Sequence, residues 1–150
     1  MSLCIWLGAE LGSKMIKIRY MVDNVAEAVK FYSQQLGFNL LQQYRVAVAI
    51  LEHSGVELIV SGPISSAGQP MPDGTKPSPG GGWARFQIVV EDIEAEIGRL
   101  KEIGVAFKNE LIEGGGRKQI LCLDPSGNII ELFEDRQEWI VRKIELWCGG

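Results

Sequence analysis

Two segments of the chain repeat one pattern of hydrophobic and polar positions. Each segment begins with a run in which apolar and polar residues alternate, and this period of two predicts a β-strand. Each run leads to a residue suited to cap a helix, Asn24 in the first segment and Asp92 in the second. Apolar residues at helical spacing follow and end at a glycine, Gly37 or Gly104. Both segments therefore predict a strand followed by a helix.

Short apolar runs separated by polar breaks follow each predicted helix. A DPSG tetrapeptide at 124–127 precedes the last run, and its proline and glycine favour a tight turn. Each half thus has the predicted order βαβββ, and the expected fold class is α+β with two such modules forming paired half-barrels around a cavity. The expected strands are 16–22, 38–41, 45–51 and 56–60 in the first half, and 86–90, 105–108, 119–123 and 128–133 in the second.

Residues 61–82 lie between the two halves and are rich in proline and glycine. They show no apolar period, so neither a helix nor a central strand is expected there. A loop of this length inside a domain is typical of a pocket border or of a linker. The expected organisation is an N-terminal extension at 1–14, one domain at 15–134 and an amphipathic C-terminal tail at 135–150. Within the domain we expect module one at 15–62, a loop at 63–82 and module two at 83–134.

Composition narrows the class of protein. The 150 residues are 46% hydrophobic and 23% charged, as in a globular domain with a real core. A formal charge of −4 without a basic cluster argues against a nucleic-acid surface, and no apolar run is long enough to span a membrane. Three widely spaced cysteines indicate free thiols, and hence a cytoplasmic protein.

The two βαβββ halves, together with the FY…LGF segment at 31–38 and DPSGNIIELFE at 124–134, resemble the vicinal oxygen chelate superfamily. This is the group of glyoxalases, bleomycin-resistance proteins and extradiol dioxygenases. More narrowly, the sequence resembles an uncharacterised bacterial branch known only as glyoxalase-family proteins. The resemblance implies a cavity enclosed by paired half-barrels. It also implies that the metal-dependent members take ligands from the first and last strands of each half.

Counting from the helix caps places these first-strand positions at Lys17 and Arg85 and the last-strand positions at Glu57 and Glu131. The metal enzymes of the superfamily carry His, Gln and Glu there. Lysine and arginine offer no lone pair while protonated, and two carboxylates alone make a poor transition-metal site. The sole histidine, His53, falls in a predicted turn. We therefore expect no catalytic metal and no other cofactor.

If all four side chains face the cavity, two cations oppose two carboxylates where the ion would lie. One interpretation is a structural ion-pair network that replaces the metal. Another is that Lys17 or Arg85 binds a carboxylate, phosphate or enolate of a ligand, with Glu131 as acceptor or general base. In a third, one or more of these side chains point to solvent.

Other polar and aromatic residues near predicted strand ends are candidate ligand contacts. Trp83 ends the long loop and could cover a pocket, although it could equally belong to the core. Arg117 and Gln119 follow a glycine run that would let backbone approach a ligand, and Asn109 ends a strand. Each could instead be a solvated surface residue.

The sequence leaves four functions open. The first is a metal-free protein that binds a small anionic or aromatic molecule, and the second is a metal-free enzyme of lyase, isomerase or dioxygenase type with Glu131 as base. A metal-dependent enzyme is disfavoured by the missing histidines, and a pure interaction module is the fourth. The resemblance and the apolar tail also lead us to expect a homodimer.

Overall fold

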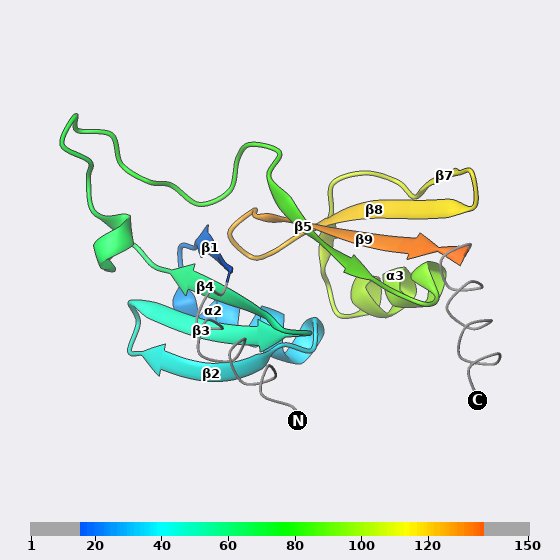
Figure 1. Ribbon diagram of the computed structural model, residues 1–150, viewed down its shortest axis with the longest axis horizontal. Coiled ribbons are helices and arrows are strands. Elements are labelled where there is room, and N and C mark those ends of the chain that lie inside the picture. Colours follow the sequence, from blue (N-terminus) through cyan, green and yellow to red (C-terminus); the bar gives the residue numbers. More distant parts are fainter. Residues whose placement is uncertain (1–15, 137–150) are drawn as a thin grey trace, which may run out of the picture.

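The computed structural model describes residues 16–136. The expected N-terminal extension and most of the expected tail lie outside these residues. Within them the strands form two sheets, one for each half of the chain, with the two halves side by side and joined by a long loop (Figure 1). No helix among the described residues has the length and apolar content to cross a membrane.

Module one follows the predicted order. The first strand pairs in parallel with the last, because the helix between them carries the chain back across one face of the sheet, and the sheet order is β1-β4-β3-β2. Its elements are β1 (Lys17–Met21), α2 (Val25–Lys30), η1 (Phe31–Gln35), β2 (Asn39–Tyr44), β3 (Val48–His53) and β4 (Val56–Ser61).

The helix of module one begins and ends where the sequence predicts. The Asn24 side chain accepts a hydrogen bond from the Glu27 amide at 3.0 Å. The α-helix then widens into one π-helical turn, η1, and Gly37 lies just beyond it with a φ of +76°, a conformation that glycine adopts without steric cost.

Module two repeats the arrangement with sheet order β5-β9-β8-β6, and the short strand β7 pairs with β8. Asp92 caps its helix by accepting from the Ala95 amide at 3.0 Å. Strand β7 was not predicted, because its three residues are too few to show a period. The elements are β5 (Arg85–Val89), α3 (Ile93–Glu102), β6 (Ala106–Phe107), β7 (Ile112–Gly114), β8 (Arg117–Leu123) and β9 (Ile129–Asp135).

The loop between the modules contains one short 3₁₀ helix, η2 (Ser66–Gly68), where no helix was expected. Ser65 explains it, since its hydroxyl accepts from the Gly68 amide at 3.2 Å and stabilises a single turn. At the far end of the loop, Gly80 lies against the DPSG turn, where an added Cβ would meet the Ser126 carbonyl oxygen at 3.0 Å. The Gly80 amide also donates to Asn128 Oδ1 at 3.2 Å, so this end of the loop is held against module two.

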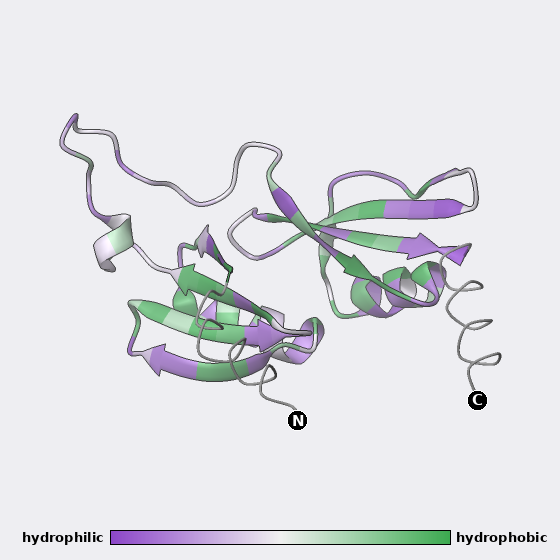
Figure 2. Ribbon diagram, in the orientation of Figure 1, coloured by the Kyte–Doolittle hydropathy of each residue, from purple (hydrophilic) through white to green (hydrophobic). Residues whose placement is uncertain are grey.

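The helix of each module packs on one face of its sheet, and the hydrophobic core lies between the helices and the sheets. Figure 2 shows that the polar residues of β8 and β9 gather at the ends remote from their connecting turn, while the apolar residues lie nearer that turn. The largest fully buried side chains are Tyr32, Leu51, Leu58, Ile93, Leu100, Ile120, Ile130 and Leu132, which come from both modules.

The predicted tight turn at 124–127 holds the two modules together. Gly127 adopts a φ of +85° and its amide donates to the Asp124 carbonyl at 3.0 Å. The Asp124 carboxylate, 4% exposed, accepts from the Tyr32 hydroxyl of module one at 2.8 Å. Asn128 donates to the Met21 carbonyl at 2.8 Å. This turn of module two therefore satisfies buried polar groups of module one.

Candidate functional site

The first strand of each module separates a core face from an open face. Residues of β1 and β5 alternate between exposed and partly buried, since the helices cover only one side of each sheet. The open faces carry Lys17 and Arg19 in module one and Arg85 and Gln87 in module two. The predicted first-strand positions are thus on the faces away from the helices.

In module one, Lys17 lies directly opposite Glu57 in the parallel pairing of β1 and β4. The Lys17 Nζ is 2.9 Å from Glu57 Oε2, but the direction of approach does not make a hydrogen bond, and this buried oxygen has no hydrogen-bond partner among the described residues. The attraction is therefore that of an ion pair alone. With 45% of the Lys17 side chain exposed, it contributes at most about 1 kcal/mol.

Arg19 is a second cation on this face that the sequence reasoning missed. Its Nη1 donates to the buried Ser61 hydroxyl at 2.7 Å. The sequence alone could have indicated this position, because Arg19 is two residues from Lys17 in a strand and residues two apart lie on the same face.

In module two the carboxylate of Glu131 is held by two donors. Arg85 Nε donates to Oε2 at 2.6 Å and Gln87 Nε2 donates to Oε1 at 2.7 Å. Arg85 Nη1 also donates to the Trp83 carbonyl at 3.3 Å, and no described residue accepts from its Nη2. Glu131 is only 6% exposed, so the guanidinium is fixed on a buried anchor with donors still free.

In the described part of the chain, the four charged residues form two separate pairs and not the single network proposed from the sequence. Lys17 pairs with Glu57 and Arg85 with Glu131, and no contact joins the two pairs. The reason is topological, because each first strand lies beside the last strand of its own module.

The two modules have the same strand register but carry their acidic residues at different positions in the last strand. Arg19 and Gln87 hold the same place in the repeat, yet Arg19 lies opposite Ile59 and Gln87 lies opposite Glu131. Ile59, and not Glu57, is therefore the module-one residue equivalent to Glu131. Glu57 lies two residues earlier along its strand.

The remaining predicted residues cluster around the open face of module two with one exception. Trp83 is 67% exposed, and Lys108 Nζ lies 4.3 Å from its ring centroid. Arg117 and Gln119 belong to β8 and lie on the same face of the sheet as Glu131, and Arg117 pairs with an aspartate of β9 at 3.1 Å.

The exception is Asn109. Its Oδ1 accepts from the Leu121 amide and its Nδ2 donates to the Glu110 carbonyl, both at 2.9 Å. The side chain is thus used to fix the local backbone between β6 and β7. Its role as a ligand contact stays a prediction.

The donor set at the superfamily's metal positions does not fit a transition metal. Lys17 and Arg85 supply no lone pair, and the oxygens of Glu131 are already hydrogen-bonded. The described residues contain one group of three potential acidic ligands elsewhere, at the start of α3, and each is engaged with protein donors. This group is Asp92, Glu94 and Glu134, which contact the Ala95 amide, Lys118, and the Ile93 amide with Arg136.

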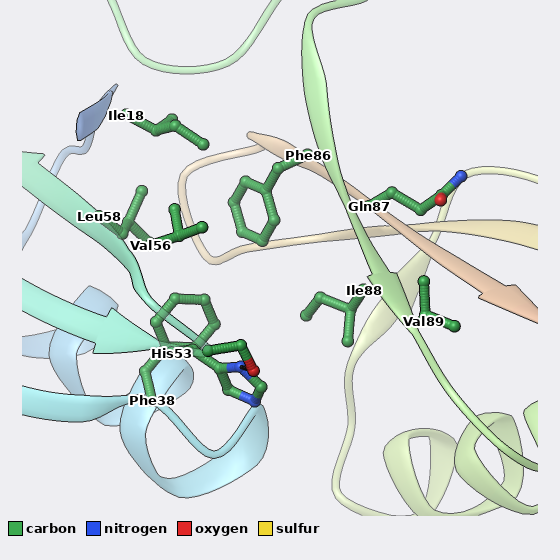
Figure 3. A pocket seen from close by; sticks show the side chains of 10 residues that line it. Ile18, Phe38, His53, Val56, Leu58, Phe86, Gln87, Ile88 and Val89 are labelled. Carbon is green, nitrogen blue, oxygen red and sulfur yellow. Dashed lines mark hydrogen bonds between the residues drawn. The ribbon is translucent and has the colours of Figure 1, made fainter. Parts of the chain in front are cut away.

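An apolar cleft of about 290 Å³ lies between the two modules and is bordered by residues of β1, β3, β4 and β5. Figure 3 shows Phe86 and Ile88 of β5 facing Val56 and Leu58 of module one across it. None of the site residues predicted from the sequence lines this cleft. His53, expected in a turn, instead ends β3 and lines the cleft with its ring 5.0 Å from that of Phe38.

Burial raises the pKa of three titratable groups near the junction of the modules. It raises the pKa of Tyr20, whose hydroxyl donates to the Ile129 carbonyl at 2.8 Å, to about 12. Burial next to Asp124 raises the pKa of Tyr32 far above its ordinary range. Burial also raises the pKa of the Cys122 thiol to about 12. These groups therefore stay neutral, and we assign them to the core.

A family model described as the Glyoxalase/Bleomycin resistance protein/Dioxygenase superfamily matches residues 14–132. No curated protein matches the sequence. Among solved structures, a lactoylglutathione lyase from Agrobacterium tumefaciens is similar with a TM-score of 0.63 at 16% identity, over 81% of this chain and 93% of that one. An antibiotic-binding protein from Streptomyces sp. CB03234 is similar with a TM-score of 0.60 at 22% identity, over 82% and 96%.

A superfamily member from Sphaerobacter thermophilus is also similar, with a TM-score of 0.63 at 21% identity, over 83% of this chain and 98% of that one. At these identities the structural likeness shows the fold alone. The family model, in contrast, covers most of the sequence and both modules. The chain therefore belongs to the Glyoxalase/Bleomycin resistance protein/Dioxygenase superfamily.

Proposed function

We propose that this chain is a metal-independent binding protein for a small organic anion, held at the open face of module two. The observation that carries this proposal is the Arg85 guanidinium, which is anchored on buried Glu131 while Nη2 has no acceptor among the described residues. A guanidinium fixed in this way can bind a carboxylate or phosphate with little loss of side-chain entropy. Glu131 acts by positioning Arg85.

Neighbouring side chains favour an aromatic anion over a simple inorganic one. Exposed Trp83 offers a ring face two residues before Arg85, and Lys108 adds a second positive charge beside that ring. Gln119 and Arg117 extend the same face with further donors. A flat ligand with one carboxylate would stack on Trp83 and pair with Arg85.

A second copy of the chain is our proposed cover for this open face. Val89 and Ile112 are exposed at 63% and 52% on the sheet of module two, which is unfavourable for a surface left in water. Pairing of two chains is common in the superfamily that the sequence resembles. We propose a homodimer in the cytoplasm, in keeping with the buried free thiol of Cys122.

An enzyme with Glu131 as general base is the alternative. Such a base would take a proton from a substrate while Arg85 stabilised the resulting oxyanion. Both Glu131 oxygens already accept hydrogen bonds from Arg85 and Gln87, so a base at this position would have to give up one of these contacts to reach a substrate proton. This arrangement favours holding an anion over removing a proton.

The test combines metal analysis with anion titration. Protein purified without chelator should hold no stoichiometric metal, and Zn²⁺, Ni²⁺, Mn²⁺ and Fe²⁺ should give no specific thermal stabilisation. Benzoate should bind in calorimetry and be recovered unchanged. Arg85→Lys should weaken binding by about tenfold or more, because a lysine cannot make the bidentate contact. Arg99→Gln, which removes an ion-paired arginine from α3, is the matched control and should bind benzoate normally.

Stoichiometric metal with a large stabilisation would overturn the metal-free assignment. Equal benzoate affinity in Arg85→Lys and the unaltered protein would overturn the anion site. Conversion of a bound anion to another compound would favour the enzyme.

A further inference from the structure

We propose that the apolar cleft between the modules is a second binding site, which takes a small neutral aromatic alcohol. This inference does not depend on the anion site, because Trp83, Arg85 and Glu131 do not line the cleft. Strand β5 ends its sheet, and residues from both of its sides border the cleft: Phe86 and Ile88 from one side, Gln87 and Val89 from the other (Figure 3). The cleft thus lies beside the anion site but contains none of its charged groups.

The size of the cleft suits a molecule of one or two rings. Its volume of about 290 Å³ is near the lower end of the range for ligand pockets, which is roughly 300–1,000 Å³. Its walls are mainly apolar, so that water inside it would find few hydrogen-bond partners and an apolar ligand would release that water favourably. The apolar lining residues are Ile18, Phe38, Val56, Leu58, Phe86, Ile88 and Val89.

The cleft is built on rigid parts of both modules. Phe38 packs edge-on against Phe86 with ring centroids 6.0 Å apart, which fixes the distance between the two walls. On the module-one side, the β3–β4 turn is held by the Gly55 amide, which donates to Glu52 Oε1 at 2.8 Å. A preformed apolar cavity of this kind binds without a large cost in conformational entropy.

Three polar residues line the cleft, and His53 defines the ligand's head group, because the Ser54 hydroxyl contacts His53 and the Gln87 amide donates to Glu131. His53 Nδ1 lies 2.8 Å from the Ser54 hydroxyl, and no described residue is bonded to Nε2. If the hydroxyl donates to Nδ1, then Nε2 carries the proton and donates; if Nδ1 donates, then Nε2 accepts. A ligand hydroxyl satisfies either tautomer because it both donates and accepts. A carboxylate would satisfy only one of them, and no arginine or lysine lines the cleft to neutralise it.

The proposal is tested with 1-naphthol, with naphthalene as the probe that lacks only the hydroxyl group. Calorimetry should show saturable binding of 1-naphthol, and amide shifts in NMR spectra should fall on Phe86 and Ile88. Val56→Trp, which fills the cleft from a partly exposed position, should weaken binding by about tenfold or more. His53→Phe keeps a ring at the wall and should abolish the preference for 1-naphthol over naphthalene.

Tyr44→Phe is the matched control: Tyr44 is exposed on β2 and does not line the cleft, so this change should leave 1-naphthol binding unchanged. Absence of saturable binding would overturn the proposal, as would full affinity in the Val56→Trp protein or amide shifts confined to the open face of module two. An equal preference for the hydroxyl in His53→Phe would overturn the role of His53. Failure here with intact benzoate binding at Arg85 would leave the anion site standing, so the two proposals fail separately.

Discussion

Replacing Tyr32 with phenylalanine should destabilise the protein through the junction of its modules. The hydroxyl of Tyr32 donates to Asp124 Oδ2 at 2.8 Å, and both groups are buried. Hydrogen bonds to charged groups contribute about 1.5–3 kcal/mol, and phenylalanine preserves the packing of the ring. Asp124 keeps its donors from Ser126 and Asn128, so the expected loss of unfolding free energy is near the middle of this range, about 2 kcal/mol.

Urea unfolding of the unaltered protein and of Tyr32→Phe would measure this loss. An unchanged dependence of the unfolding free energy on urea concentration would show that both proteins undergo the same transition. Tyr44→Phe is the control, since Tyr44 is 52% exposed, and it should change stability by less than about 0.5 kcal/mol. Because Asn128 donates to the same carboxylate, Tyr32→Phe and Asn128→Ala should be non-additive by more than about 0.5 kcal/mol. A Tyr32→Phe loss no larger than that of Tyr44→Phe, or strictly additive effects, would refute the coupling of the modules through Asp124.

Further outcomes follow from other positions. Gly80→Ala should lower the free energy of unfolding in urea more than Gly81→Ala does. Both substitutions cost about 1 kcal/mol because each residue has a positive φ, but only a Cβ at position 80 meets the Ser126 carbonyl oxygen, at 3.0 Å. Equal losses would refute the contact. With the other two cysteines replaced by serine, Cys122 should resist iodoacetamide until the protein unfolds, because burial raises its pKa to about 12, and rapid labelling of native protein would contradict this. The raised pKa of Tyr20 favours its neutral form in the folded state, so the free energy of unfolding should fall as the pH rises from about 10 through about 12. In Tyr20→Phe this pH dependence, measured by denaturant unfolding, should be flatter.

The fold could be predicted because its signals are local and repeated. The caps Asn24 and Asp92 and the terminal glycines lie where the sequence places them, and the alternation of β1 and β5 assigned their faces. Strand β7 and the 3₁₀ turn at Ser66–Gly68 were not predicted, because a segment of three residues is too short to show a hydrophobic period. The expected strand at 45–51 starts later, at Val48, because Arg45 adopts a φ of +53° in the turn before it.

The candidate site was harder to predict because it depends on which strands meet. The open faces of Lys17 and Arg85 followed from the period of two, but the cleft at His53 requires the packing of module one against β5, which no local pattern encodes. The turn role of Asn109 is likewise set by the neighbouring strand, since its acceptor is used by the Leu121 amide. Long-range contacts of this kind are the part of a site that a single sequence does not specify.

The position of the acidic residue in each last strand explains why two similar sequences form unlike sites. Lys17 lies directly opposite Glu57, so its flexible ammonium group meets a carboxylate at the same level of the sheet and half of it stays in water. Arg85 lies opposite Ile129 and reaches diagonally to Glu131, where Gln87 supplies a second donor. The diagonal reach orients the guanidinium and buries its partner, whereas the direct pair in module one leaves a carboxylate oxygen without a hydrogen bond. A carboxylate placed two residues further along the last strand, on the same face, therefore makes module two the half of the repeat in which we propose that a cation is fixed for a ligand.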